Sequence, residues 1–181
     1  MKSRYNVWVL SLVFLSGLVL ASQTYNSTTG RFSGSGSGIP QKGLVTGSAY
    51  TNATTTFSSI TGLSFAVSAS TNYAVTCQLV YQGTATTAGP KFQWTGPASP
   101  TAVLIGVNGD TGPTALADAA ATAFSTALTT LGTLADTGVN HTGIITLGLV
   151  NGVNAGTVQL QAAANGSGTV TIAVGSYCTM Q

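Results

Sequence analysis

Residues 73–82 read YAVTCQLVYQ, and the character of the side chain alternates along the whole stretch. Every odd-numbered position carries an aromatic, apolar or cysteine side chain, whereas Thr76, Gln78 and Gln82 stand at even-numbered positions. Because successive side chains of a β-strand point to opposite faces, this period of two places the apolar groups on one face. The stretch therefore predicts a strand with one buried face.

Shorter runs of the same kind lie on both sides of this stretch, with turn residues between them. The predicted strands cover residues 57–60, 63–68, 91–95, 101–107, 144–150, 157–163 and 168–177. Asn-Gly steps such as Asn151-Gly152 and Asn165-Gly166 tolerate positive φ and favour hairpin turns. Many short strands without a required helix predict an all-β chain, folded as an antiparallel, jelly-roll-like β-sandwich of two sheets.

Residues 115–135 fit two different patterns. Leu116, Ala120 and Phe124 belong to an apolar stripe at helical spacing, which favours an amphipathic helix. The threonines that alternate along residues 122–130 are β-branched, and such side chains lower helix propensity. We favour a strand over residues 122–130 and keep the helix as the alternative.

The N-terminus, residues 1–21, has the three parts of a secretory signal peptide. Lys2 and Arg4 give a positive start, residues 7–20 form a short apolar stretch, and a small-x-small exit ends at Ala21. This pattern predicts a signal-like helix and export, so that the mature protein is extracellular or virion-associated. The alternative is an uncleaved leader that acts as a membrane anchor, which is the sole membrane contact expected.

The next segment, residues 22–44, is rich in Gly and Ser and contains the tract SGSGSG. Such a composition cannot bury enough apolar surface to order itself, and it predicts a flexible linker. The β-sandwich domain is therefore expected over residues 45–181.

Charged residues are scarce throughout the chain. The 181 residues include 5 Lys or Arg and 3 Asp or Glu, all of the latter Asp. Without Lys2 and Arg4 the remainder carries three cations and three anions, 3 − 3 = 0. Nucleic-acid binding depends on clustered Lys and Arg that neutralise phosphates, so this balance excludes nucleic acid as a partner.

Cys77 and Cys178 are the chain's 2 cysteines. In an oxidising compartment an even pair indicates a disulfide, and this one would close a loop of about 100 residues, worth roughly 4.7 kcal/mol in the chain-entropy model. The alternative is two separate buried thiols.

Candidate catalytic and metal-binding residues are few. His141 is the single histidine of the sequence, and Asp136 precedes it by five residues. A Ser-His-Asp arrangement is therefore formally available, although no GxSxG elbow supplies a nucleophile. Residues 138–143 predict a surface turn instead. Asp110 also lies in a predicted turn, and three aspartates are too few for a calcium ligand set. The sequence therefore predicts no enzyme, no metal and no cofactor.

Three aromatic residues of the predicted strands are candidates for recognition. Tyr81, Phe92 and Trp94 are expected to fill the core or a seam between subunits, because aromatic side chains bury the largest areas. The alternative is an exposed aromatic face that binds sugar rings.

Three ordered segments carry a resemblance to a known family. TGLSFAVSASTNY (61–73), TGPASPT (95–101) and GLVNGVNAGTVQLQAAANGSGTVTIAVGSY (148–177) resemble a β-sandwich module of tailed-phage and prophage virion proteins, found in tail fibres, appendages and minor structural proteins. The resemblance covers roughly residues 45–181. It implies a jelly-roll-like sandwich assembled as a homotrimer through one sheet, and it carries no catalytic residues.

The expected function is therefore non-enzymatic: a structural or surface-recognition protein that forms an extracellular assembly and meets a cell-surface glycan or receptor. A leader and a disulfide are unusual for a phage structural protein. They favour the alternative, a secreted bacterial adhesin or carbohydrate-binding module.

Overall fold

The computed structural model describes residues 24–26, 31–33 and 40–181, and these fall into two units. In the first unit, β1 (Thr24–Asn26) pairs antiparallel with β2 (Arg31–Ser33), inside the segment assigned to a flexible linker. The predicted signal helix and most of that linker lie outside the described residues. No described helix is long and apolar enough to cross a membrane.

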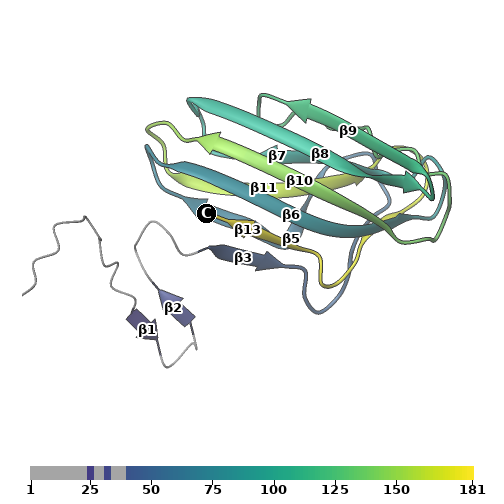
Figure 1. Ribbon diagram of the computed structural model, residues 1–181, viewed down its shortest axis with the longest axis horizontal. Helices are drawn as coiled ribbons and strands as arrows, with labels where there is room; N and C mark the ends of the chain where they lie inside the picture. Colours follow the sequence, from purple (N-terminus) through teal and green to yellow (C-terminus); the bar gives the residue numbers. More distant parts are fainter. Residues whose placement is uncertain (1–23, 27–30, 34–39) are drawn as a thin grey trace, which may run out of the picture. The chain divides into compact units, whose positions relative to one another are not determined.

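The second unit, Gly38–Gln181, consists of antiparallel strands in two sheets (Figure 1). Its strands are β3 (Gln41–Leu44), β4 (Tyr50–Asn52), β5 (Ser58–Val67), β6 (Asn72–Gly83), β7 (Pro90–Thr95), β8 (Ala102–Gly112), β9 (Ala115–Ala121), β10 (His141–Val150), β11 (Gly156–Ala164), β12 (Val170–Ile172) and β13 (Tyr177–Met180). The 8-stranded sheet has the order β3-β13-β6-β10-β8-β9, with β12 between β6 and β4. The 3-stranded sheet has the order β5-β11-β7. The prediction of an all-β chain with two antiparallel sheets is confirmed.

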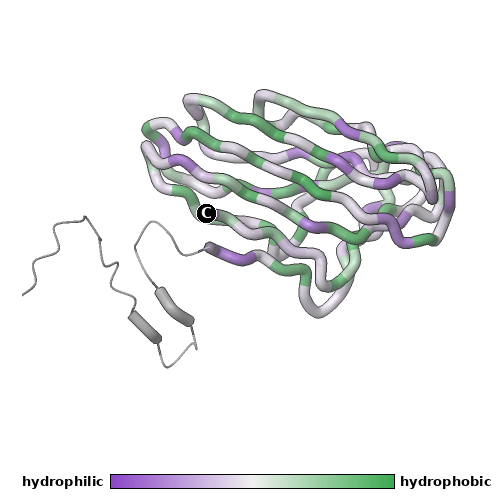
Figure 2. Tube along the Cα trace, viewed as in Figure 1, coloured by the Kyte–Doolittle hydropathy of each residue, from purple (hydrophilic) through white to green (hydrophobic). Residues whose placement is uncertain are grey.

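The predicted strand over residues 73–82 is the middle of β6, which lies near the centre of the larger sheet. It pairs with β10 on one edge and with β13 and β12 on the other. Val75, Cys77, Leu79 and Tyr81 are buried, as the alternation predicts. The same alternation is visible along β6, β8 and β10 as recurring hydrophobic residues (Figure 2).

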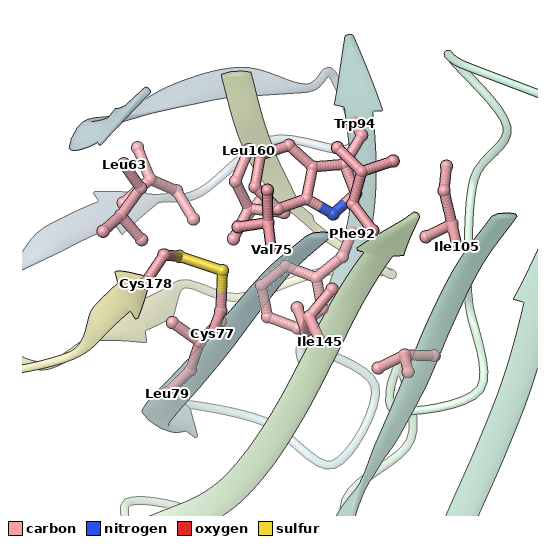
Figure 3. Packing of buried hydrophobic residues seen from close by; sticks show 14 of the residues in the cluster. Leu63, Val75, Cys77, Leu79, Phe92, Trp94, Ile105, Ile145, Leu160 and Cys178 are labelled. Carbon is pink, nitrogen blue, oxygen red and sulfur yellow. A yellow bond between two sulfur atoms is a disulfide. The ribbon is translucent and has the colours of Figure 1, made fainter. Parts of the chain in front are cut away.

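One hydrophobic cluster fills the space between the sheets. The smaller sheet contributes Ile60, Leu63, Phe65, Phe92, Trp94, Val158 and Leu160, and the larger sheet contributes Val75, Leu79, Tyr81, Ile105, Val107, Ile145 and Leu147. Figure 3 shows Trp94 and Phe92 of β7 directed at the side chains of the opposite sheet. The two sheets therefore share a single core, as in a β-sandwich.

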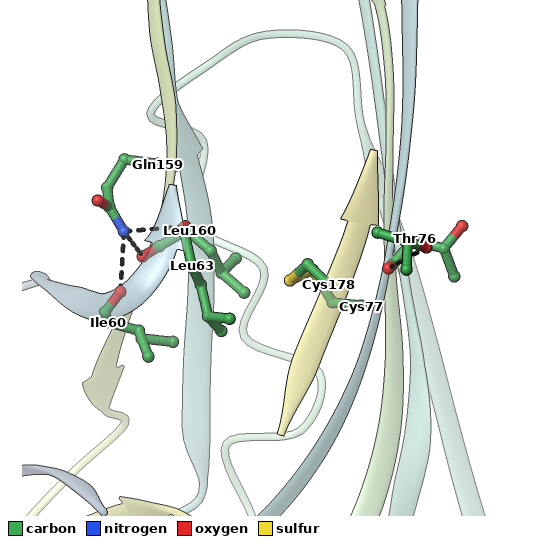
Figure 4. The surroundings of a disulfide bond; sticks show 8 residues. Ile60, Leu63, Thr76, Cys77, Gln159, Leu160 and Cys178 are labelled. Carbon is green, nitrogen blue, oxygen red and sulfur yellow. Dashed lines mark hydrogen bonds between the residues drawn. A yellow bond between two sulfur atoms is a disulfide. The ribbon is translucent and has the colours of Figure 1, made fainter. Parts of the chain in front are cut away.

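The predicted disulfide is confirmed. Cys77 of β6 and Cys178 of β13 are direct partners in the strand register and are bonded to each other. Both are fully buried, and Leu63 and Leu160 of the smaller sheet lie beside the bond (Figure 4). The bond ties the last strand of the chain to the central strand of the larger sheet.

Several strand boundaries differ from the sequence prediction. Residues 41–44, assigned to the linker, form β3, because pairing with β13 satisfies their backbone groups. The predicted strands 57–60 and 63–68 are one strand, β5, which passes through Gly62 at a φ of 89°. The predicted strand 168–177 is divided into β12 and β13 by a turn whose residue Ser176 bonds to the backbone of β6.

The prediction for residues 115–135 was wrong in both forms. The strand is β9, which ends at Ala121, and no helix forms in this segment. Residues 122–130 are irregular, although Leu128 exchanges two backbone hydrogen bonds with Phe92 and so lies along the free edge of β7. Leu128 and Leu131 also stand at the spacing of the apolar stripe, and both are buried without a helix, Leu128 beside its backbone bridge to Phe92.

A double variant, Cys77→Ala/Cys178→Ala, tests the disulfide. We expect the free energy of unfolding to fall by about 4 to 5 kcal/mol, because a loop of about 100 residues is no longer closed in the unfolded chain. Guanidinium titration of both proteins measures the change. Reductant should destabilise the wild type and leave the double variant unaffected, whereas equal midpoints for the two proteins would contradict the prediction.

Candidate functional site

The outer face of the larger sheet, called here the large-sheet face, is unusually apolar. Along β8 and β10, apolar side chains occur at both odd-numbered and even-numbered positions. The odd-numbered side chains enter the core, and the even-numbered ones face outward. Leu104 is 62% exposed, Ile144 48% and Leu116 77%. Leu44 and Val150 are also exposed on this face.

The outer face of the smaller sheet, the small-sheet face, is polar instead. It carries Ser59, Thr61, Ser64, Lys91, Gln93, Thr95, Thr157, Gln159 and Gln161, which alternate with core residues along β5, β7 and β11. Within the described residues no large hydrophobic side chain is exposed on it. The two outer faces of one sandwich therefore differ in chemistry.

A groove of about 420 Å³ crosses the large-sheet face. Its floor is a row of side chains from three neighbouring strands, because Ile144 of β10 pairs with Gln78 of β6 and with Asn108 of β8. Tyr177 of β13 and Leu116 of β9 line its ends. Amides that both donate and accept hydrogen bonds thus lie beside apolar side chains.

A hydrogen-bonded pair, the partly exposed Asp110 and the buried His141, links β8 to β10 beside this groove. His141 Nδ1 lies 2.6 Å from Asp110 Oδ1, and Asp110 Oδ2 accepts hydrogen bonds from Thr142 N at 2.8 Å and Thr142 Oγ1 at 2.9 Å. The His141 ring stacks on Tyr81, whose hydroxyl donates to the backbone carbonyl of Asp110. The pair therefore connects three strands of the larger sheet.

The environment shifts two pKa values in this cluster. Partial burial alone would raise the pKa of the Asp110 carboxyl, but the hydrogen bonds from Thr142 and His141 outweigh it and hold that pKa below its ordinary value. Burial, with a contribution from the nearby Asp110 carboxylate, raises the pKa of Tyr81. Asp110 is therefore held as a carboxylate by its donors.

The sequence predictions for His141 and Asp110 need correction. Neither lies in a surface turn: His141 begins β10 and is 3% exposed, and Asp110 lies within β8. The carboxylate partner of His141 is Asp110 and not Asp136. In the described part of the chain no serine hydroxyl is hydrogen-bonded to His141, whose Nε2 has no partner. No three His, Cys, Asp or Glu side chains there lie close enough to hold a metal ion.

The aromatic candidates are core residues. Tyr81 and Phe92 are each 1% exposed and Trp94 is 0% exposed. They fill the space between the sheets and present no face to a sugar ring or to a neighbouring subunit. The alternative of an exposed aromatic face is therefore wrong for these three.

Sequence reasoning missed the residues that line the groove. One signal was available in the sequence. Residues 101–107 and 144–150 carry apolar side chains at odd-numbered and even-numbered positions alike, a pattern typical of strands covered on both faces. The alternation of residues 73–82 also places Gln78 on the outer face. The joining of Gln78, Asn108 and Ile144 into one row depends on strand order, which no local pattern contains.

Comparison with protein-family models, with curated proteins and with solved structures gave no match for this chain.

Asp110→Asn tests the linkage of the Asp110–His141 pair to stability. Because the pKa of Asp110 is lowered on folding, its contribution is present above the ordinary carboxyl value of 3.8 and is lost as the pH falls through the lower folded value. We expect the wild type to exceed the variant in stability at neutral pH, and the difference to shrink below about pH 4.

Urea midpoints between neutral and strongly acidic pH measure this difference. Asp136→Asn is the matched control, because that side chain makes no ion pair with His141. A stability difference between wild type and Asp110→Asn that is the same at every pH would contradict the prediction.

Proposed function

We propose that this protein is a non-enzymatic structural or surface-recognition subunit of an extracellular or virion-associated assembly, similar to the β-sandwich modules of tailed-phage virions. The observation that carries the proposal is the large-sheet face, where apolar side chains such as Leu104 and Ile144 are exposed. Ile144 pairs with Asn108, and Leu104 pairs with Gly148, so the exposed apolar side chains alternate with polar and small residues across one face. Exposed apolar side chains gathered on one face mark an interaction site, and a chain that assembles with its own copies covers it.

The strand order supports a jelly-roll topology for the sandwich. β3, the first strand of the second unit, pairs with β13, the last, and β6 and β10 follow in the same sheet. β5 pairs with β11, and β11 with β7, in the other sheet. The chain passes between the sheets at six connections: β4 to β5, β5 to β6, β6 to β7, β7 to β8, β10 to β11 and β11 to β12. Repeated crossings of this kind are typical of Greek-key and jelly-roll sandwiches.

The disulfide supports the extracellular part of the proposal. Such bonds persist in oxidising compartments and are rare where thiols are kept reduced. The bond between Cys77 and Cys178 is thus in keeping with export, for which the leader over residues 1–21 is the predicted signal.

A second candidate function, an adhesin or carbohydrate-binding module, is favoured by the groove. Gln78, Asn108 and Thr142 offer neutral donors and acceptors that suit sugar hydroxyls, and Ile144 offers an apolar surface for a ring. Both candidates use the large-sheet face. A stable assembly through that face would cover the groove, so the two functions exclude each other.

The mass of the purified protein in solution separates the candidates. We expect light scattering coupled to size exclusion to give the mass of a trimer, with and without reductant, because the disulfide lies within one chain. A monomer at every concentration examined would contradict the assembly and bring the binding module forward.

A glycan array gives the complementary test. We expect no saturable binding, because the assembled protein covers its groove. Saturable binding that is lost in Asn108→Ala and kept in Gln93→Ala, a matched amide on the small-sheet face, would establish the second candidate in its place.

A further inference from the structure

We propose that a second copy of this chain occupies the large-sheet face, with the β9 edge of one copy against the β3 edge of the next and Lys42 opposite Asp118. The inference rests on the proposed assembly and goes beyond it by naming the contact face, the partner and the relative order of the edges.

The choice of face follows from where the exposed apolar side chains lie. Five of the eight large hydrophobic residues exposed in the described chain lie on the large-sheet face: Leu44, Leu104, Leu116, Ile144 and Val150. The other three, Val139, Val153 and Val174, lie in loops. Single exposed hydrophobic residues are common on protein surfaces, but their confinement to one of two outer faces indicates a covered face.

The choice of partner follows from the charges on that face. Lys42 lies on β3 and pairs across the strands with Thr179, and Asp118 lies on β9 and pairs with Asn108. The carboxylate of Asp110, the other charge on this face, is already occupied by His141 and Thr142. Among the residues that the structure describes, this face thus carries one cation and one anion that form no ion pair within the chain, so it is complementary to itself.

The two charges lie at opposite edges of the sheet. β3 and β9 are the outer strands of the order β3-β13-β6-β10-β8-β9, which separates them by five strand spacings, about 24 Å. Lys42 and Asp118 are therefore too far apart to pair within one chain. The nearest aromatic contact of Lys42 is Tyr177, 4.9 Å from Nζ to the ring centroid.

A cyclic arrangement of copies accounts both for the exposed apolar side chains and for the two charges at opposite edges of the sheet. When copies are related by an axis parallel to the strands and turn the large-sheet face toward it, the β3 edge of each copy meets the β9 edge of the next. In the register of the sheet Lys42 is level with Ala120, two residues along β9 from Asp118, an offset of about 7 Å that the long lysine side chain spans. Lys42 then lies within reach of Asp118 at every contact, while Ile144 and Leu104 of the central strands point toward the axis. Three copies close such a ring in the proposed trimer.

Exchanging the two charges tests whether the β3 edge of one copy lies against the β9 edge of the next. Lys42→Asp and Asp118→Lys should each weaken association at least about tenfold, because like charges then oppose each other at every contact. The double variant Lys42→Asp/Asp118→Lys should recover the wild-type association. Lys91→Asp, on the small-sheet face, is the matched control and should associate as the wild type does.

The dissociation constants from sedimentation equilibrium distinguish three results. Weakening in both single variants with recovery in the double variant supports the inference. An oligomeric wild type whose association is unchanged by the single variants, or not recovered in the double variant, overturns the inference and leaves the assembly standing. A monomeric wild type overturns both.

A second pair of variants examines the apolar part of the contact. Leu104→Gln should weaken association, whereas Val153→Gln, which changes a loop residue that is 80% exposed, should leave it unchanged. Equal association of the two variants would overturn the choice of face. Neither change removes a core side chain, so both proteins should keep the far-ultraviolet circular dichroism of the wild type.

Discussion

The scarcity of charge is the constraint on which the rest of this structure depends. A two-sheet sandwich has two outer faces to solvate, and the chain has 4% charged residues with which to do so. The small-sheet face is solvated by Ser, Thr and Gln, whereas the large-sheet face carries exposed leucine and isoleucine. Exposed leucine and isoleucine on one outer face, and none on the other, are explained when another molecule covers the first face.

The disulfide links the edge of the large-sheet face to the core. β3, which carries Lys42, reaches the larger sheet by pairing with β13, and β13 is bonded to β6 through Cys178 and Cys77. The bond therefore fixes the edge that the proposed contact uses, in addition to constraining the unfolded chain. The hydrogen bond between Asp110 and His141 holds β8 to β10 in the same sheet. Core and contact face thus depend on the same strands.

Local sequence patterns predicted the parts of the fold that depend on neighbouring residues. The alternation around Cys77 identified the central strand, and the cysteine count identified the disulfide. The prediction failed where the structure depends on distant contacts. Leu128 lies along the edge of β7, and His141 is buried against the ring of Tyr81 on the neighbouring strand. The groove row of Gln78, Ile144 and Asn108 depends on strand order, which no local pattern encodes.

The most direct test of a covered large-sheet face is the reactivity of an introduced thiol. The described chain has no free cysteine, so maleimide labelling of Thr146→Cys, on the large-sheet face, can be compared with Ser64→Cys, on the small-sheet face. Both positions are exposed in a single chain. We expect much slower labelling at position 146, with the difference disappearing on dilution. Equal rates in the concentrated protein would contradict it.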